Sequence, residues 1–187
     1  SIVSSGTINN FYALENEELA TISNKRRISN SGLVLNDGTI DNSDTIDNYN
    51  DGHIFNDGTI DNSGAINNSG IFDNSAGTFN NFGLFGGTGT FIGTLDTGTG
   101  TVSPGASSGT MNVDGNFILS DGGTLKIDIE GIDDCDFLDV AGAADFQTGG
   151  AIRFSLNNFD ITTHLGYNER MTLKFLETDG GITGLFS

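Results

Sequence analysis

Residues 38–72 read GTIDNSDTIDNYNDGHIFNDGTIDNSGAINNSGIF, and this stretch decides the fold class. It repeats a six-residue unit, Gly-x-Ile-x-Asn-x, that has a single apolar position. Followed outward in both directions, that position recurs at steps of six to eight residues and is filled by Ile8, Leu14, Ile22, Ile28, Val34, Ile40, Ile46, Ile54, Ile60, Ile66, Phe72, Phe79, Phe85 and Phe91. An Asn lies two residues after each of the first twelve of these positions. Such regular spacing indicates a repeat protein.

The period of six separates this repeat from the regular secondary structures. A helix has an apolar period near 3.6 residues, and a half-buried strand alternates every two residues. One apolar residue in six fits a three-residue strand whose middle side chain points inward, followed by a corner. Three such sides make a rung of about 18 to 20 residues, which predicts an all-β chain folded as a single-stranded parallel β-helix.

Gly and Asn are the residues expected at the corners of this coil. Both tolerate positive φ, and stacked Asn side chains can bond to one another along the coil axis. The corner residues predicted in this way include Asn42, Asn62, Asn68 and Asn74. The side chains predicted to form the core include Ile8, Ile40, Ile46, Ile60, Ile66, Phe72 and Phe79.

The outward positions give a check on the register of the coil. The residue after each inward one is usually polar, but it is apolar at Leu35 and Phe55, which are 20 residues apart. A three-sided coil places these two side chains one above the other on the same face. The same register stacks Asp41 on Asp61, a like-charge pair that is unfavourable unless it is solvated or bridged by a cation.

Residues 11–27 allow a second interpretation. Glu15, Glu17 and Glu18 precede the basic run 25–27, which is the charge order of a short amphipathic helix. However, the hexapeptide frame continues through this segment without a break. Strand and corner are therefore favoured, with extra residues bulging out where the step between apolar positions is eight.

Longer alternating segments replace the hexapeptide from Gly93 onward. They are expected to form strands at 110–113, 124–129, 152–156 and 171–176, with Leu125, Ile127 and Ile129 pointing inward. We expect residues 1–92 to form a hexapeptide-repeat β-helix. Residues 93–187 should continue or cap the same solenoid with wider rungs.

The charge of the chain excludes several classes of function. Seven Lys and Arg against 25 Asp and Glu give a net charge of −18, so nucleic acid is excluded as a partner because a basic groove is missing. No apolar run is long enough to span a bilayer, so we expect no membrane insertion. One cysteine, Cys135, and two histidines, His53 and His164, supply no ligand set for zinc.

Three segments resemble a known family. Residues 100–116, GTVSPGASSGTMNVDGN, resemble the SPG-x-S-x-G-T-L-x-V-x-G element of autotransporter-type passenger domains and related bacterial β-helix surface proteins. DFLDVAG at 136–142 and GGITGLF at 180–186 are similar to the D-x-L-x-V-x-G strand and the G-I-x-G-x-F ending of that family. The resemblance implies a right-handed parallel β-helix outside the cell, at the cell surface. The handedness rests on the resemblance, because a hexapeptide repeat also suits left-handed coils.

Candidates for chemistry are few. Asp133, Asp134 and Asp136 could offer carboxylate oxygens to calcium, but the favoured interpretation of these residues is a polar turn before the strand at 137–140. His53 and His164 are expected to be solvated turn residues, since no G-x-S-x-G elbow accompanies them. We therefore expect no catalytic residues and no cofactor other than, at most, calcium.

These observations favour a non-enzymatic extracellular structural protein, the subunit of a self-assembling surface fibre or adhesin. A β-helix ends in a rung with unpaired backbone groups, so the expected partner is a further copy of the chain, stacked end to end. Glycans or host surfaces are the other expected partners. The alternative function is a carbohydrate-binding or carbohydrate-cleaving β-helix protein.

Overall fold

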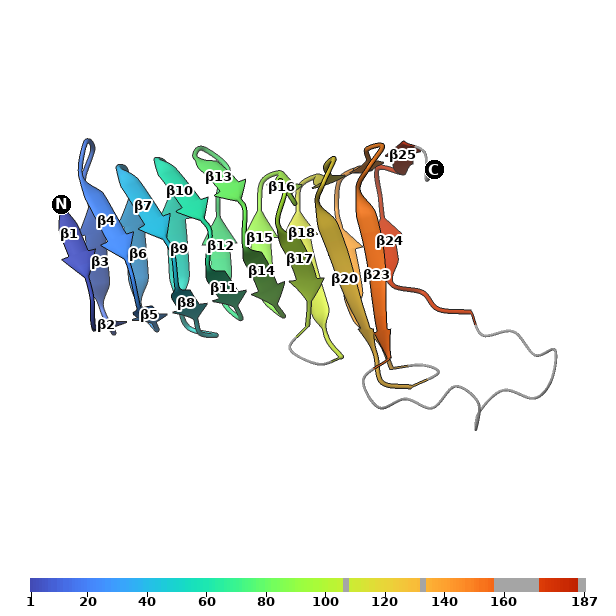
Figure 1. The fold of residues 1–187 in the computed structure, drawn as a ribbon, viewed down its shortest axis with the longest axis horizontal. Helices are drawn as coiled ribbons and strands as arrows, with labels where there is room; N and C mark the ends of the chain where they lie inside the picture. The colour runs from blue at the N-terminus through green and yellow to red at the C-terminus, as the bar shows by residue number, and fades with distance from the viewer. Residues whose placement is uncertain (106–107, 132–133, 157–171, 185–187) are drawn as a thin grey trace.

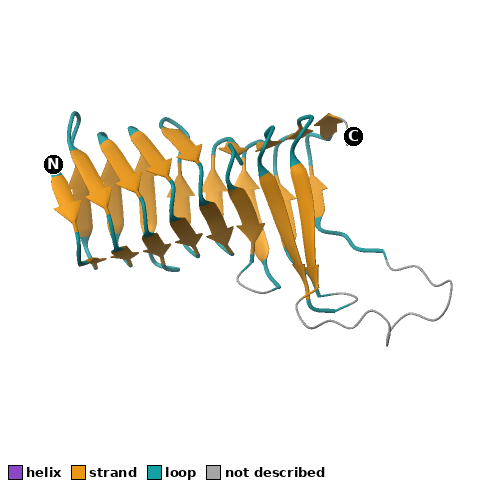
Figure 2. Ribbon diagram, in the orientation of Figure 1, coloured by secondary structure: helices purple, strands orange, loops and turns teal. Residues whose placement is uncertain are grey.

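The computed structural model describes residues 1–105, 108–131, 134–156 and 172–184. In these residues the chain is a parallel β-solenoid with no helix, as Figures 1 and 2 show, which confirms the predicted fold class. No helix in this part is long and apolar enough to cross a membrane. Successive strands turn around one axis, and strands of successive rungs pair in parallel into four sheets.

Each sheet is one face of the solenoid, named here A to D. Face A consists of β1 (Ile2–Ser4), β4 (Thr21–Asn24), β7 (Thr39–Asn42), β10 (Thr59–Asn62) and β13 (Thr78–Asn81). Face B consists of β2 (Thr7–Asn10), β5 (Arg27–Asn30), β8 (Thr45–Asn48), β11 (Ala65–Asn68), β14 (Leu84–Gly87), β17 (Thr101–Pro104), β20 (Thr124–Ile129) and β23 (Ala151–Leu156). Face C consists of β3 (Ala13–Asn16), β6 (Leu33–Asn36), β9 (His53–Asn56), β12 (Ile71–Asp73), β15 (Thr90–Ile92), β18 (Thr110–Asp114), β21 (Phe137–Val140) and β24 (Leu176–Thr178). Face D consists of β16 (Leu95–Asp96), β19 (Phe117–Leu119), β22 (Ala144–Phe146) and β25 (Ile182–Gly184), and it takes over from face A beside β13.

The register follows the hexapeptide. Ile40 pairs with Ile60 and Asp41 pairs with Asp61, so each residue meets the one 20 positions later in the chain. Leu35 pairs with Phe55, as the outward positions predicted. The two eight-residue steps are accommodated by turns at 17–20 and 49–52, as expected. Strands continue through residues 13–16 and 21–24, so the helical interpretation of this segment is wrong.

The inward side chains form one continuous apolar column. Ile40, Ile46, Ile60, Ile66 and Phe72 are buried, and burial of a side chain of this size contributes about 1.5–3 kcal/mol. Ile8 and Phe79 are partly buried and pack against this core. In the middle of the solenoid, Ile gives way to four phenylalanines whose ring centroids lie 5.2–5.9 Å apart, namely Phe72, Phe79, Phe85 and Phe91.

Asparagines, all buried except the partly buried Asn74, form three ladders along the corners. In the ladder at the end of face A, Asn24 Nδ2 donates to Asn42 Oδ1 at 2.7 Å, Asn42 Nδ2 to Asn62 Oδ1 at 2.8 Å, and Asn62 Nδ2 to Asn81 Oδ1 at 2.9 Å. The other two ladders run through Asn10, Asn30, Asn48 and Asn68, and through Asn16, Asn36, Asn56 and Asn74. In every link the amide donates toward the later rung, so each ladder has a direction.

The corners are built differently from the sequence-based expectation of positive φ. Among the described residues Leu19 alone is a non-Gly residue with positive φ, so the expectation that Asn adopts this conformation is wrong. Glycines such as Gly58 and Gly64 are needed for a steric reason, because a Cβ there would overlap a backbone carbonyl of the rung before. Glycine with positive φ occupies the corner position only where the Asn ladders stop, for example at Gly87, whose φ is 119°.

The wider rungs agree with the expected strands except near the end of the chain. β18, β20 and β23 cover the predicted segments, and Leu125, Ile127 and Ile129 are buried. The predicted strand at 171–176 is wrong, because residues 172–175 are not in a strand and β24 begins only at Leu176. Met171 lies outside the described residues.

Candidate functional site

Two adjacent hollows lie on face B, and together they are called the face B trough. The first has a volume of about 240 Å³ and is lined by Asn67, Ser69, Leu84, Gly86, Gly87, Ser103, Gly105 and Asp128. The second has a volume of about 540 Å³ and is lined by Thr101, Thr124, Lys126, Arg153, Phe154 and Ser155. The trough thus crosses five neighbouring strands of face B, from β11 to β23.

The local sequence explains why this part of face B is hollow. Outward positions carry larger side chains on the earlier strands, but β14 has Gly86 there, and Gly87 and Gly105 flank it without side chains. The next strands add small hydroxyl residues, with Thr101 paired to Thr124 in register. A floor of glycine with hydroxyl groups beside it exposes many hydrogen-bonding groups and little bulk.

Two cations stand side by side at the wide end of the trough. Lys126 of β20 and Arg153 of β23 are register partners on the outer surface. Lys126 Nζ lies 2.7 Å from Asp128 Oδ2, so its charge is paired. Arg153 is exposed and forms no ion pair with any described residue. The next residue, Phe154, is the register partner of the buried Ile127, and its ring lies 5.3 Å from that of Phe175, so it faces the inner side of β23 and not this pair.

Asp128 and Asp136 form a buried carboxyl pair behind this end of the trough. Asp136 is fully buried and its Oδ2 accepts the N–H of Asp128 at 2.9 Å. One buried oxygen of each carboxyl group, Oδ1, has no hydrogen-bond partner. Burial, with a further contribution from Asp128, raises the pKa of Asp136 to about 6.

The predicted calcium residues do not come together. Asp134 is exposed, whereas the carboxyl group of Asp136 is buried against the backbone of Asp128, and Asp133 lies outside the described residues. Within the described ranges no three His, Cys, Asp or Glu side chains are grouped as a metal site would require. Burial raises the pKa of Cys135 between these aspartates, which keeps its thiol protonated.

His53 is not the solvated turn residue that the sequence predicted. It is the first residue of β9, and its ring stacks on Phe55 with a centroid separation of 3.7 Å. Its Nε2 is buried without a hydrogen-bond partner, and burial lowers the pKa of its imidazole. Beside it, Leu33 and Ile71 are exposed, so His53 is part of an apolar strip on face C. His164 lies outside the described residues.

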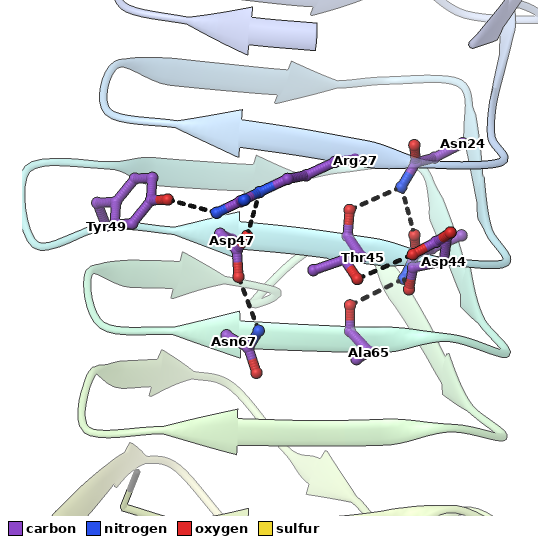
Figure 3. A network of polar contacts seen from close by, with 9 residues as sticks. Asn24, Arg27, Asp44, Thr45, Asp47, Tyr49, Ala65 and Asn67 are labelled. Carbon is purple, nitrogen blue, oxygen red and sulfur yellow. Dashed lines mark hydrogen bonds and ion pairs between the residues drawn. The ribbon is translucent and has the colours of Figure 1, made fainter. Parts of the chain in front are cut away.

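The basic run of residues 25–27 is divided by the fold. Lys25 and Arg26 are exposed at a corner, while Arg27 lies on face B, where its Nε is 2.6 Å from Asp47 Oδ2 and its Nη2 donates to the Tyr49 hydroxyl at 2.7 Å (Figure 3). Asp47, and after it Tyr49, raises the pKa of Arg27. The charge of Arg27 is therefore paired within the solenoid.

Sequence reasoning missed the face B trough. Its residues come from five strands, and neighbouring strands are up to 27 residues apart in the sequence, as Lys126 and Arg153 are. The signal that could have found it was the replacement of Asn and Asp by Gly and Ser at outward positions from Gly86 onward.

A comparison of the chain with models of protein families, with curated protein sequences and with solved structures finds no match.

Proposed function

We propose that the chain is a non-enzymatic extracellular structural protein, a stiff segment of a surface fibre or adhesin that stacks on copies of itself. The observation that carries the proposal is the stacking of like rungs, in which β1, β2 and β3, the outermost described strands at one end, pair in the same parallel register as the rungs that follow. The apolar column and the Asn ladders lead up to this rung without a change of pattern. Open edges of this kind template the addition of further strands.

The direction of the edge hydrogen bonds follows from the later rungs. On face B the first residue of each strand from β8 onward donates backward, as Thr45 N–H does to Arg26 O at 2.9 Å and Ala65 N–H to Asp44 O at 2.7 Å. Thr7 occupies the same register position in β2. Its N–H therefore points away from β5, toward the place where a further rung would lie.

The same end offers apolar surface to a partner. Ile2 and Val3 are 47% and 63% exposed, and Ile8 and Leu14, which would be buried inside the solenoid, are only partly covered. A partner rung at about 4.8 Å would bury these side chains and pair the free backbone groups. Contact between two different ends of a molecule does not close on itself, so it produces filaments rather than dimers.

The net charge of −18 opposes this association. Repulsion between like charges is screened by salt, so filaments should lengthen as ionic strength rises from low to near-physiological values. Electron microscopy and analytical ultracentrifugation of the purified chain test this directly.

A pair of variants at Thr7 sharpens the test. Thr7→Pro removes the outward N–H without breaking a hydrogen bond inside the chain and should abolish filaments, because proline cannot donate to a strand ladder. Thr7→Val keeps the N–H and the branched side chain and should assemble like the parent. A parent chain that stays monomeric at high concentration and high salt, or filaments that form equally with Thr7→Pro, would contradict the assembly.

A further inference from the structure

The face B trough is long and continuous. Its five strands are neighbours in one sheet, so at about 4.8 Å per strand the trough extends about 19 Å along the solenoid axis. Asp128 lines the first hollow and pairs with Lys126, which lines the second, so the two hollows meet at this ion pair. A trough of this length suits an extended chain rather than a compact small molecule.

The lining chemistry matches hydroxyl-rich ligands. Thr101, Thr124 and Ser103 offer hydroxyl groups, and Asn67 offers an amide, so each can both donate and accept hydrogen bonds. The glycine floor at Gly86 lets a ligand approach the backbone closely. Apolar surface, which includes Leu84, exceeds polar surface in the first hollow, and the second hollow is about evenly polar and apolar. A surface that combines apolar carbon with hydroxyl groups suits the mixed faces of a sugar.

The positive charge at the wide end of the trough favours a ligand that carries negative charge. The chain has seven Lys and Arg residues, and the fold places Lys126 and Arg153 side by side. The bond to Asp128 uses part of the charge of Lys126, which leaves the exposed guanidinium of Arg153 as the charge available to a ligand. A guanidinium matches a carboxylate or sulfate group through two parallel hydrogen bonds.

We propose that the face B trough binds an anionic polysaccharide, with an acidic sugar at Arg153 and neutral hydroxyl contacts along Thr101, Thr124 and Ser103. This inference deepens the adhesin part of the proposed function by naming a class of ligand. It does not depend on end-to-end assembly. Because binding is measured on the Thr7→Pro chain, a failure of ligand binding is distinguished from a failure of assembly.

Binding is tested by isothermal titration calorimetry with polygalacturonate, dextran sulfate and uncharged dextran. Polygalacturonate or dextran sulfate should bind, uncharged dextran should bind at least about 10-fold more weakly, and raising the salt concentration should weaken the anionic ligands. Arg153→Gln should weaken anionic binding about 10-fold or more, because a hydrogen bond to a charged group is lost. The affinity of Arg153→Lys for the anionic polymers should lie between those of the parent and of Arg153→Gln, since lysine keeps the charge and loses the planar guanidinium.

Arg26→Gln is the matched control, because it removes the same charge from an exposed corner outside the trough. It should change the affinity less than about two-fold, as screening limits the effect of distant surface charges. Circular dichroism should show that both variants keep the parent fold. Equal losses for Arg153→Gln and Arg26→Gln, or no binding of either anionic polymer, would overturn the proposal. Single-stranded DNA that binds as tightly and depends equally on Arg153 would overturn the assignment to saccharides.

Discussion

Removing one amide from the middle of an Asn ladder should cost a large share of the stability of the solenoid. Asn42 is 1% exposed and accepts the amide of Asn24 at 2.7 Å. It donates to Asn62 Oδ1 at 2.8 Å and to two backbone carbonyls, Ala65 O at 3.1 Å and Asp44 O at 3.3 Å. Asn42→Ala loses all four bonds and leaves the oxygen of Asn62 buried without this donor.

The magnitude follows from these contacts. Each of the two strong hydrogen bonds between side chains contributes about 1 kcal/mol. With the weaker backbone bonds and the buried acceptor left without a donor, the free energy of unfolding should fall by about 3–4 kcal/mol. This is a substantial fraction of the 5–15 kcal/mol that stabilises a typical domain, which is about the range expected here. Urea denaturation followed by circular dichroism at neutral pH measures the loss.

Two further variants separate hydrogen bonding from volume. Asn67→Ala deletes the same atoms on the outer surface, where the amide has one bond to Asp47 at 2.7 Å, and should cost less than about 1 kcal/mol. Asn42→Asp keeps the size of the side chain but replaces two donor hydrogens with an acceptor facing Asn62, so it should destabilise at least as much as Asn42→Ala at neutral pH. A loss for Asn42→Ala within about 1 kcal/mol of that for Asn67→Ala, or an Asn42→Asp chain as stable as the parent, would refute the reasoning.

Two more predictions concern buried charge. Since the pKa of Asp136 is raised from 3.8 to about 6, the folded chain holds a proton that the unfolded chain has released, and stability falls as pH rises through this window, by about 3 kcal/mol in total. Asp136→Asn should therefore be more stable than the parent at pH 7.5 and should lose this pH dependence in urea titrations, whereas Asp134→Asn, an exposed control, should keep it. If Asp136→Asn follows the pH profile of the parent, Asp136 does not titrate in this window. Ile60→Asp, which places a carboxylate in a fully buried position, should cost about 4 kcal/mol or more in thermal or urea unfolding, while Thr59→Asp on the outer surface should cost little. A folded Ile60→Asp chain of near-parent stability would contradict the continuous apolar column.

The corners of the solenoid could be predicted as positions but not as conformations. The spacing of Asn two residues after each apolar residue locates the corners, because one side of the coil needs a fixed number of residues. The sequence alone does not reveal that Asn42 has ordinary negative φ, or that Gly64 is required by the carbonyl of Asp44 one rung earlier. That requirement exists only when rungs 20 residues apart are stacked.

The sequence by itself determined the repeat, the inward column and the pairing of rungs in the hexapeptide half, since a period of six and a step of 18 to 20 residues leave few registers in which Leu35 meets Phe55. It misplaced the strand that begins at Leu176 and misjudged His53, because in these places packing against distant residues decides the environment. Only the tertiary structure decided that Asp136 is buried while Asp134 is exposed, and that Lys126 meets Arg153 at one end of a trough. The physical reason is that rungs in the hexapeptide half differ by at most two residues, from 18 to 20, whereas later rungs lengthen to 27 residues between Lys126 and Arg153 and to 38 between Leu138 and Leu176. A residue's lateral neighbours then depend on how many residues each loop holds, which a local periodic pattern does not encode.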